Sequence, residues 1–124
     1  MNGLYLKIKQ SPDCMVTDLQ QVQPLLLVVL GWFVHFCDSH ELHCEVTNIF
    51  GKFAVSKSDT HPEGRAFDAS VRGWSKQDVD DCLQFMDDKA GRLGAFSASD
   101  QKQRVVVYHN VGLGNHLHFQ IQRG

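Results

Sequence analysis

The sequence predicts an α+β fold in which a small, mainly antiparallel sheet is covered on one side by two helices. Three observations support this class. Apolar and polar residues alternate in several short segments, a long apolar run lies near residues 25 to 37, and a second helical pattern follows residue 75. At 124 residues the chain is long enough to form one domain, residues 1–124, with little room for a second.

Composition narrows the range of partners. The chain has 12 basic and 14 acidic residues and a formal charge of -2, so the dense basic surface that a phosphate backbone requires is not expected, and nucleic acid is not an expected partner. The four cysteines lie far apart and form no CxxC pair, which favours reduced, structural thiols; they are Cys14, Cys37, Cys44 and Cys82.

The first strand is predicted over Leu4–Lys9, where alternation puts two lysines on one face, as suits an edge strand. A helix is expected from a cap at Thr17 or Asp18 to about Cys37, with Pro24 as its kink or as a second start. Its apolar stretch has only 13 residues, from 25 to 37, whereas a bilayer span needs about 20. We therefore expect the most buried helix of the domain and no stable membrane insertion; a holin-like or signal-anchor role is the alternative.

The middle of the chain is predicted to form two strands separated by a loop. Leu42–Thr47 alternates and reads as a strand whose inward residues are Leu42, Cys44 and Val46. Periodicity is lost over Asn48–Thr60, which predicts a long loop of the kind that often carries function. A strand over residues 65 to 71 follows and ends before Gly73.

The second helix is expected to begin at a capping box formed by Ser75 and Asp78. Apolar residues then recur at helical spacing and predict a face that packs on the core; they are Val79, Cys82, Leu83, Met86 and Ala90. Gly91 and Gly94 are expected to end the helix.

The C-terminal part is predicted to be a hairpin, with a strand over Arg104–His109, a turn over Asn110–Asn115 and a last strand over His116–Gln122. Residues two apart in a strand share a face, so the last strand has a polar face and an apolar one. The polar face, which either lines a site or faces solvent, carries His116, His118, Gln120 and Gln122.

A second segment with chemical potential is HPEGRAFD, from His61 to Asp68. Pro62 and Gly64 exclude a regular helix there, so a loop must return into a strand that carries Asp68. Together with the histidines of the last strand, this segment supplies two histidines and a carboxylate. That is the ligand set of a catalytic zinc site with one position left for water.

The two motifs, HPEGRAFD and the HLH of residues 116 to 118, resemble the HxxGxAxD and HxH signatures of the M15 family of zinc peptidases. That family includes D-Ala-D-Ala carboxypeptidases and phage L-alanyl-D-glutamate endolysins. The motifs are also similar to the zinc site of the hedgehog signalling domain, which shares the fold. The resemblance covers about His61 to Ile121 and implies a hedgehog/DD-peptidase-like domain with zinc on the open face of the sheet.

The resemblance implies that zinc is bound by His61, Asp68 and His118, and that His116 stabilises the transition state. Zinc with these ligands lowers the pKa of its bound water towards about 7 and polarises a scissile carbonyl. Arg65 is expected to orient its strand or to bind a substrate carboxylate, with a simple surface arginine as the alternative. Gln120, on the same face as the histidines, is expected to contact substrate.

The general base is where the chain departs from the family pattern. Many relatives have an acidic residue three positions before the last zinc histidine, where this chain has Asn115, which cannot take a proton from water. A hedgehog-like placement instead points to His109, whose ordinary pKa of about 6.5 suits a base, unless it is only a strand-end histidine. Glu63 and Glu45 are further candidates for the base. The substrate-binding run of relatives before His61 is also missing, and a lysine would have to substitute for it, either Lys52 or Lys57.

These features predict zinc-dependent hydrolysis of an amide bond in peptidoglycan stem peptides, of carboxypeptidase or endolysin type, by a metal-activated water. The alternatives are a zinc-stabilised binding module of the same fold that breaks no bond, and a peptidase that acts on a non-wall peptide. No signal peptide is evident at the N-terminus. We therefore expect cytoplasmic synthesis, followed by release to the cell wall or carriage on a phage particle. The oligomeric state is not predicted.

Overall fold

The computed structural model describes residues 7–8, 23–48, 65–96, 101–111 and 114–122. Five strands form the main sheet in the order β1-β2-β3-β7-β6, and two short strands form a separate sheet. In chain order the elements are β1 Lys7–Ile8, α1 Pro24–Ser39, β2 Glu45–Asn48, β3 Ala66–Ser70, α2 Lys76–Ala90, the 3-10 turn η2 Gly91–Leu93, β4 Ala95–Phe96, β5 Gln103–Arg104, β6 Val106–Val111 and β7 Gly114–Gln120.

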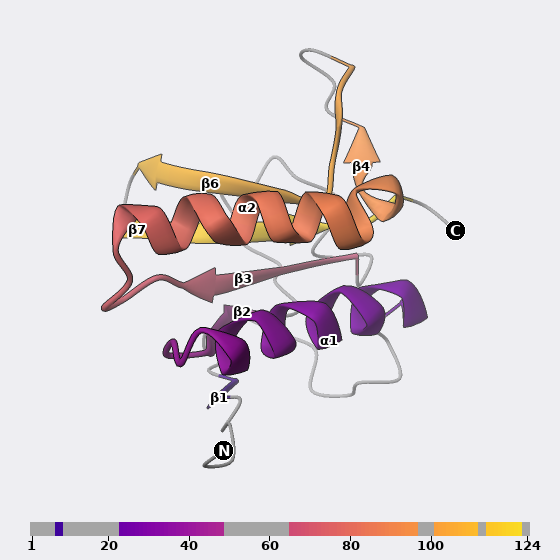
Figure 1. Ribbon diagram of the computed structural model, residues 1–124. Coiled ribbons are helices and arrows are strands. Elements are labelled where there is room, and N and C mark those ends of the chain that lie inside the picture. The colour runs from indigo at the N-terminus through magenta and orange to yellow at the C-terminus, as the bar shows by residue number, and fades with distance from the viewer. Residues whose placement is uncertain (1–6, 9–22, 49–64, 97–100, 112–113, 123–124) are drawn as a thin grey trace.

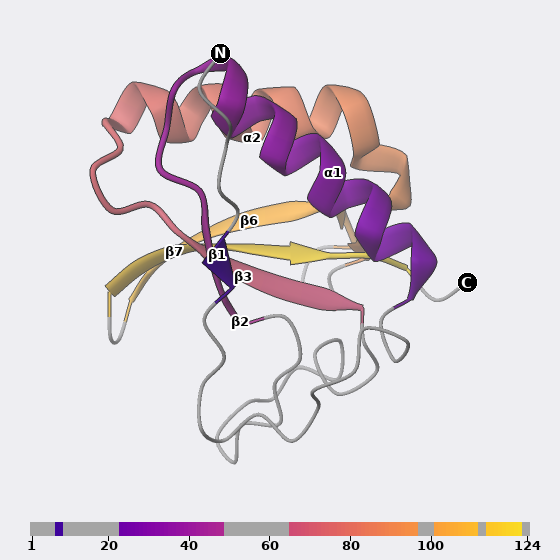
Figure 2. The ribbon, with the colours of Figure 1, turned by 90° about the horizontal axis from the view of Figure 1, so that it is seen from below.

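Both helices lie on the same face of the main sheet, as Figure 2 shows from below. Helix α1 runs beside β2 and β3, whereas α2 runs along β7 and β6 (Figure 1). The α+β class is therefore confirmed. Pairing is antiparallel throughout except between β1 and β2, which are parallel.

Aromatic side chains join α1 to the centre of the sheet. The ring centroid of Phe33 lies 4.8 Å from that of Phe119 and 6.1 Å from that of Phe67. Phe67 and Phe119 stack across β3 and β7 at 4.5 Å, and all three side chains are fully buried. Because the apolar residues of β3 and β7 face the helices, their alternate residues face the other side of the sheet.

Helix α1 begins at Pro24, so the second of the two predicted roles for this proline is the one observed; the predicted start at residues 17 and 18 lies outside the described residues. Proline suits the first helical position because a backbone N–H there has no partner within the helix, so its absence costs nothing. The helix is not buried on every side, because Leu27 and Val28 are 44% and 48% exposed. No helix in the described part of the chain is long and apolar enough to cross a membrane.

Helix α2 begins as predicted. Ser75 Oγ accepts a hydrogen bond from the Asp78 backbone N–H, and Asp78 accepts one from the Ser75 backbone N–H. The predicted apolar stripe is buried apart from Leu83, which is half-buried. Three of the four cysteines are described, and all are buried and free: Cys37, Cys44 and Cys82. Burial raises the pKa of the Cys82 thiol to about 12, so this residue stays a thiol.

Several predicted boundaries were wrong. The strand expected from Arg104 is broken at Val105, because Gln103–Arg104 leaves the main sheet and pairs with β4. That path brings the Arg104 backbone so close to Gly94 that a Cβ there would lie 2.3 Å from it. The turn expected over Asn110–Asn115 is mostly strand, because the ladder between β6 and β7 continues to Val111 and Gly114.

Two further segments differ at one end each. The predicted strand from Leu42 begins only at Glu45, although Cys44 and Val46 are buried as expected and Leu42 is half-buried. At the C-terminus, β7 ends at Gln120, and Ile121 forms only an isolated bridge with Gly94. Most of the predicted Asn48–Thr60 loop lies outside the described residues.

Candidate functional site

The candidate site lies on the face of the sheet opposite the helices, where three strands bring polar residues into register. In one cross-strand row, Asp68 of β3 pairs with His118 of β7, which pairs with Val107 of β6. In the next row, Ser70 pairs with His116, which pairs with His109. Residues that pair directly across strands share a face, so two segments about 50 residues apart in the chain meet on one surface.

Asp68 and His118 are in direct contact. His118 Nδ1 lies 2.9 Å from Asp68 Oδ1, and the two side chains are only 10% and 16% exposed. Two ligand atoms at about 2.0–2.1 Å from one tetrahedral zinc lie roughly 3.3 Å apart. A shift of a few tenths of an ångström therefore brings this pair to the separation of two zinc ligands.

Gln120 sets the direction in which His118 can bind a cation. Its side-chain Nε2 donates to the Arg104 carbonyl at 3.3 Å, which turns its Oε1 towards His118 Nε2 at 3.1 Å. An amide oxygen only accepts hydrogen bonds, so a hydrogen on His118 Nε2 can be donated to Gln120. In the neutral ring, the Nδ1 lone pair then faces a carboxylate oxygen, and this arrangement is favourable only with a proton or a metal ion between them.

The arrangement thus fits a metal ion at Asp68 and His118, with Gln120 as the outer partner that fixes the tautomer. No group of three histidine, cysteine, aspartate or glutamate side chains in the described ranges is arranged to hold a metal. The third ligand expected from the sequence, His61, lies outside the described residues, as do Glu63, Lys52 and Lys57.

His109 and His116 lie next to this pair. The ring centroid of His109 is 5.1 Å from that of His116 and 5.6 Å from that of His118. Burial, followed by the neighbouring His118 and His116, lowers the pKa of His109, and Asp68 opposes the shift. His109 is therefore a neutral imidazole near pH 7, the form that accepts a proton.

The structure does not bring Asn115 to these histidines. Asn115 has the strand parity of Leu117 and Phe119, the two residues of β7 that face the helices, and it is exposed at the start of the strand. The position that carries the acidic residue in many M15 peptidases therefore lies here on the opposite face from His118.

Arg65 is not a surface arginine, because only 5% of it is exposed. Its Nη1 donates to the Ile121 carbonyl at 2.8 Å, and the Ile121 N–H donates to the Arg65 carbonyl at 2.9 Å. These bonds tie the start of β3 to the end of β7, which agrees with the predicted role of orienting the strand. The predicted contact with a substrate carboxylate stays a prediction.

Glu45, a further candidate for the general base, is 4% exposed, with one carboxylate oxygen 3.6 Å from His43 Nε2. Since Val46 pairs with Ala69 on the helix side, Glu45 faces the site side of the sheet.

The sequence did not predict one contributor to the site, the Arg104 carbonyl that anchors Gln120. A backbone acceptor leaves no signal in a sequence.

Comparisons of the chain with protein-family models, with curated proteins and with solved structures give no significant match.

Proposed function

We propose that the protein is a zinc-dependent hydrolase that cleaves an amide bond in peptidoglycan stem peptides. The observation that carries the proposal is the pairing of Asp68 Oδ1 with His118 Nδ1 at 2.9 Å, with Gln120 Oε1 3.1 Å from the other ring nitrogen of His118. The choice of a stem peptide as substrate follows from the resemblance of the two motifs to those of M15 peptidases.

Asp68 and His118 would hold zinc together with His61. Zinc bound by neutral imidazoles and one carboxylate supplies a Lewis acid that polarises a carbonyl and acidifies water. Asp68 and His118 are mostly buried, which strengthens these electrostatic effects, because few water molecules screen them.

The neighbouring histidines supply the remaining functions. His116 pairs with Ser70 one row from the Asp68–His118 pair, where an N–H donor can stabilise negative charge that develops on a carbonyl oxygen. His109, kept neutral by its surroundings, is the group best suited to accept a proton. A base needs an unprotonated ring nitrogen, whereas a hydrogen-bond donor needs an N–H.

The proposal is tested by mass spectrometry of purified muropeptides after incubation with zinc-loaded protein, beside a chelated sample. Release of D-alanine indicates a carboxypeptidase, and separation of L-alanine from D-glutamate indicates an endolysin. Asp68→Ala is expected to abolish both zinc retention and cleavage. Asp88→Ala, a matched control at an exposed position of α2, is expected to change neither. Full activity of Asp68→Ala would contradict the proposal.

The second candidate is a binding module in which zinc orders the fold and no bond is broken. It is favoured by Asn115, which is an amide and lies on the opposite face from His118. If this candidate holds, zinc raises the melting temperature while no muropeptide is cleaved. A peptidase that acts on a non-wall peptide is distinguished by a panel of peptide substrates.

A further inference from the structure

In the described part of the chain, strand β6 lies at one edge of the main sheet. Among the strands that the structure describes, β6 pairs only with β7, while the opposite edge is the two-residue β1. Edge strands of soluble proteins usually carry charged residues, proline or a bulge that prevents pairing with another chain. The six residues of β6, VVYHNV, include no lysine, arginine, carboxylate or proline. An edge of this length without such protection is suited to pairing with a further strand.

The register of β6 identifies the backbone groups that point outwards. The Gln120 N–H donates to the Val105 carbonyl at 2.9 Å, so the odd-numbered residues from Val105 onwards direct their backbone groups towards β7. The even-numbered residues, Val106, Tyr108 and Asn110, therefore direct N–H and C=O away from β7. These groups repeat at the spacing with which an added strand forms its hydrogen bonds.

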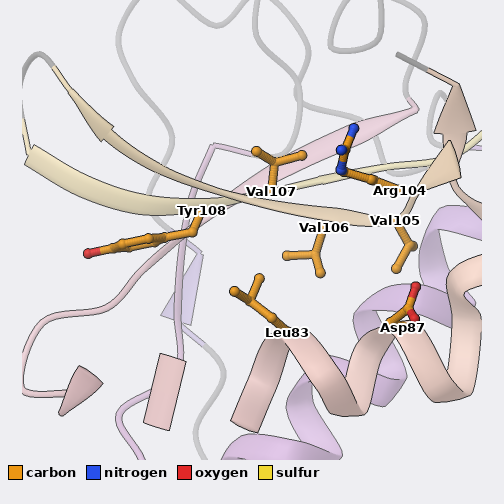
Figure 3. A pocket seen from close by; sticks show the side chains of 7 residues that line it. All are labelled: Leu83, Asp87, Arg104, Val105, Val106, Val107 and Tyr108. Carbon is orange, nitrogen blue, oxygen red and sulfur yellow. The ribbon is translucent and has the colours of Figure 1, made fainter. Parts of the chain in front are cut away.

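A groove lies between this edge and α2. It encloses about 400 Å³ and is lined by Leu83 and Asp87 of α2 and by residues 104–108. Figure 3 shows Val106 and Leu83 pointing towards one another across it, whereas Val107 points to the other side of the strand. A strand added beside β6 would thus place alternate side chains in the groove, because residues paired across strands share a face.

The helix that forms the far wall of the groove is acidic. Helix α2 carries five aspartates and two lysines, and exposed Asp87 lies at the groove itself (Figure 3). An apolar side chain suits the wall formed by Leu83, Val106 and Tyr108, whereas a basic side chain suits the end at Asp87. The groove is therefore complementary to a segment that combines both.

We propose that β6 and this groove bind an extended peptide segment of another polypeptide, with two apolar side chains and one basic side chain at alternate positions. The segment pairs with β6 through the outward groups of Val106, Tyr108 and Asn110. Its alternate side chains enter the groove, and the intervening ones lie beside Val107 and His109. This binding mode goes beyond the zinc chemistry and does not rest on it.

The test uses a fluorescent pentapeptide with valine, valine and lysine at alternate positions and threonine between them. Two versions of it are N-methylated on one or the other alternate set of backbone amides. Methylation of the set that faces β6 is expected to weaken binding about tenfold or more, because hydrogen bonds are lost and the methyl groups clash. Methylation of the other set is expected to leave affinity almost unchanged. Equal effects of both sets, or no binding of the parent peptide at millimolar concentration, would overturn the proposal.

Two measurements on the protein complete the test. Asp87→Lys is expected to weaken binding of the lysine peptide about fivefold to tenfold, whereas Asp88→Lys, with the same change in charge one residue further along α2, is expected to have little effect. Equal affinity of the peptide for both variants would contradict binding in the groove.

Hydrogen exchange identifies what covers the edge in the free protein. The amides of Val106, Tyr108 and Asn110 are expected to exchange quickly in the free monomer and slowly with peptide bound. Protection in the free monomer would show that this chain covers its own edge, and protection that depends on protein concentration would show that a second copy does. Either result overturns the proposal.

Discussion

Replacing Gln120 with leucine removes the group that sets the direction of the His118 ring. Gln120 Oε1 lies 3.1 Å from His118 Nε2, and its amide nitrogen is held by the Arg104 carbonyl. Without this acceptor, the Nε2 hydrogen loses its partner, and the tautomer with hydrogen on Nδ1, which donates to Asp68, gains population. That tautomer has no lone pair at Nδ1 for a metal, so Gln120→Leu is expected to weaken zinc binding.

The expected size follows from the outer partners of metal ligands, whose loss typically costs 10–100-fold in metal affinity, or about 1.4–2.7 kcal/mol. Competition with a fluorescent zinc chelator measures this change directly. Gln120→Glu is the informative partner variant, because a carboxylate still accepts from Nε2 although it cannot donate to the Arg104 carbonyl; its zinc affinity should fall less than that of Gln120→Leu. Gln122→Leu makes the same change two residues further along the chain, beyond the end of β7, and is expected to have little effect. If Gln120→Leu binds zinc as tightly as the unchanged protein, Gln120 does not control the tautomer of His118.

Further predictions concern stability. Gly94→Ala is expected to destabilise the fold by about 1–3 kcal/mol, because its Cβ would lie 2.3 Å from the Arg104 backbone. Gly31→Ala should instead stabilise the fold by up to about 1 kcal/mol, because a Cβ there meets open space on α1. Thermal melts compare the two variants. Ser75→Ala removes the N-cap of α2 and is expected to cost about 0.5–2 kcal/mol in urea unfolding. In the zinc-free protein the lowered pKa of His109 means that the unfolded state binds more protons below about pH 6.5, so stability should fall as the pH drops from there through the lowered pKa. His109→Gln should reduce that loss, and urea midpoints measured across the range would show no difference if the shift is absent.

Alternation along the strands predicts which face a residue occupies, but it does not predict which residues meet across strands. The sequence places His116, His118 and Gln120 on one face of a strand, and the structure agrees. The contact between Asp68 and His118 depends on the register of β3 against β7, since a slip of one residue would move Asp68 to the helix side. That register depends on tertiary packing, including the stacking of Phe67 on Phe119.

The face of the sheet on which Asn115 lies could have been predicted from the sequence. The same alternation that puts His116 and His118 on one face puts Asn115 on the other, so its strand parity already separates it from the site. The role of Gln120 could not be predicted, because it depends on a hydrogen bond to the Arg104 carbonyl. That carbonyl lies at the site because β5 pairs with β4 and the chain joins the main sheet only after Val105. Such backbone partners depend on the path of the chain and not on residue type.

Asp68 and His118 are the two described residues that we propose as ligands of one zinc ion. The most direct measurement is the number of zinc equivalents that purified protein retains after dialysis, compared between the unchanged chain, Asp68→Ala and Asp88→Ala. One equivalent is expected in the unchanged chain and in Asp88→Ala, and none in Asp68→Ala. Retention of zinc by Asp68→Ala, or its absence from the unchanged chain after loading, would show that this pair does not hold the metal.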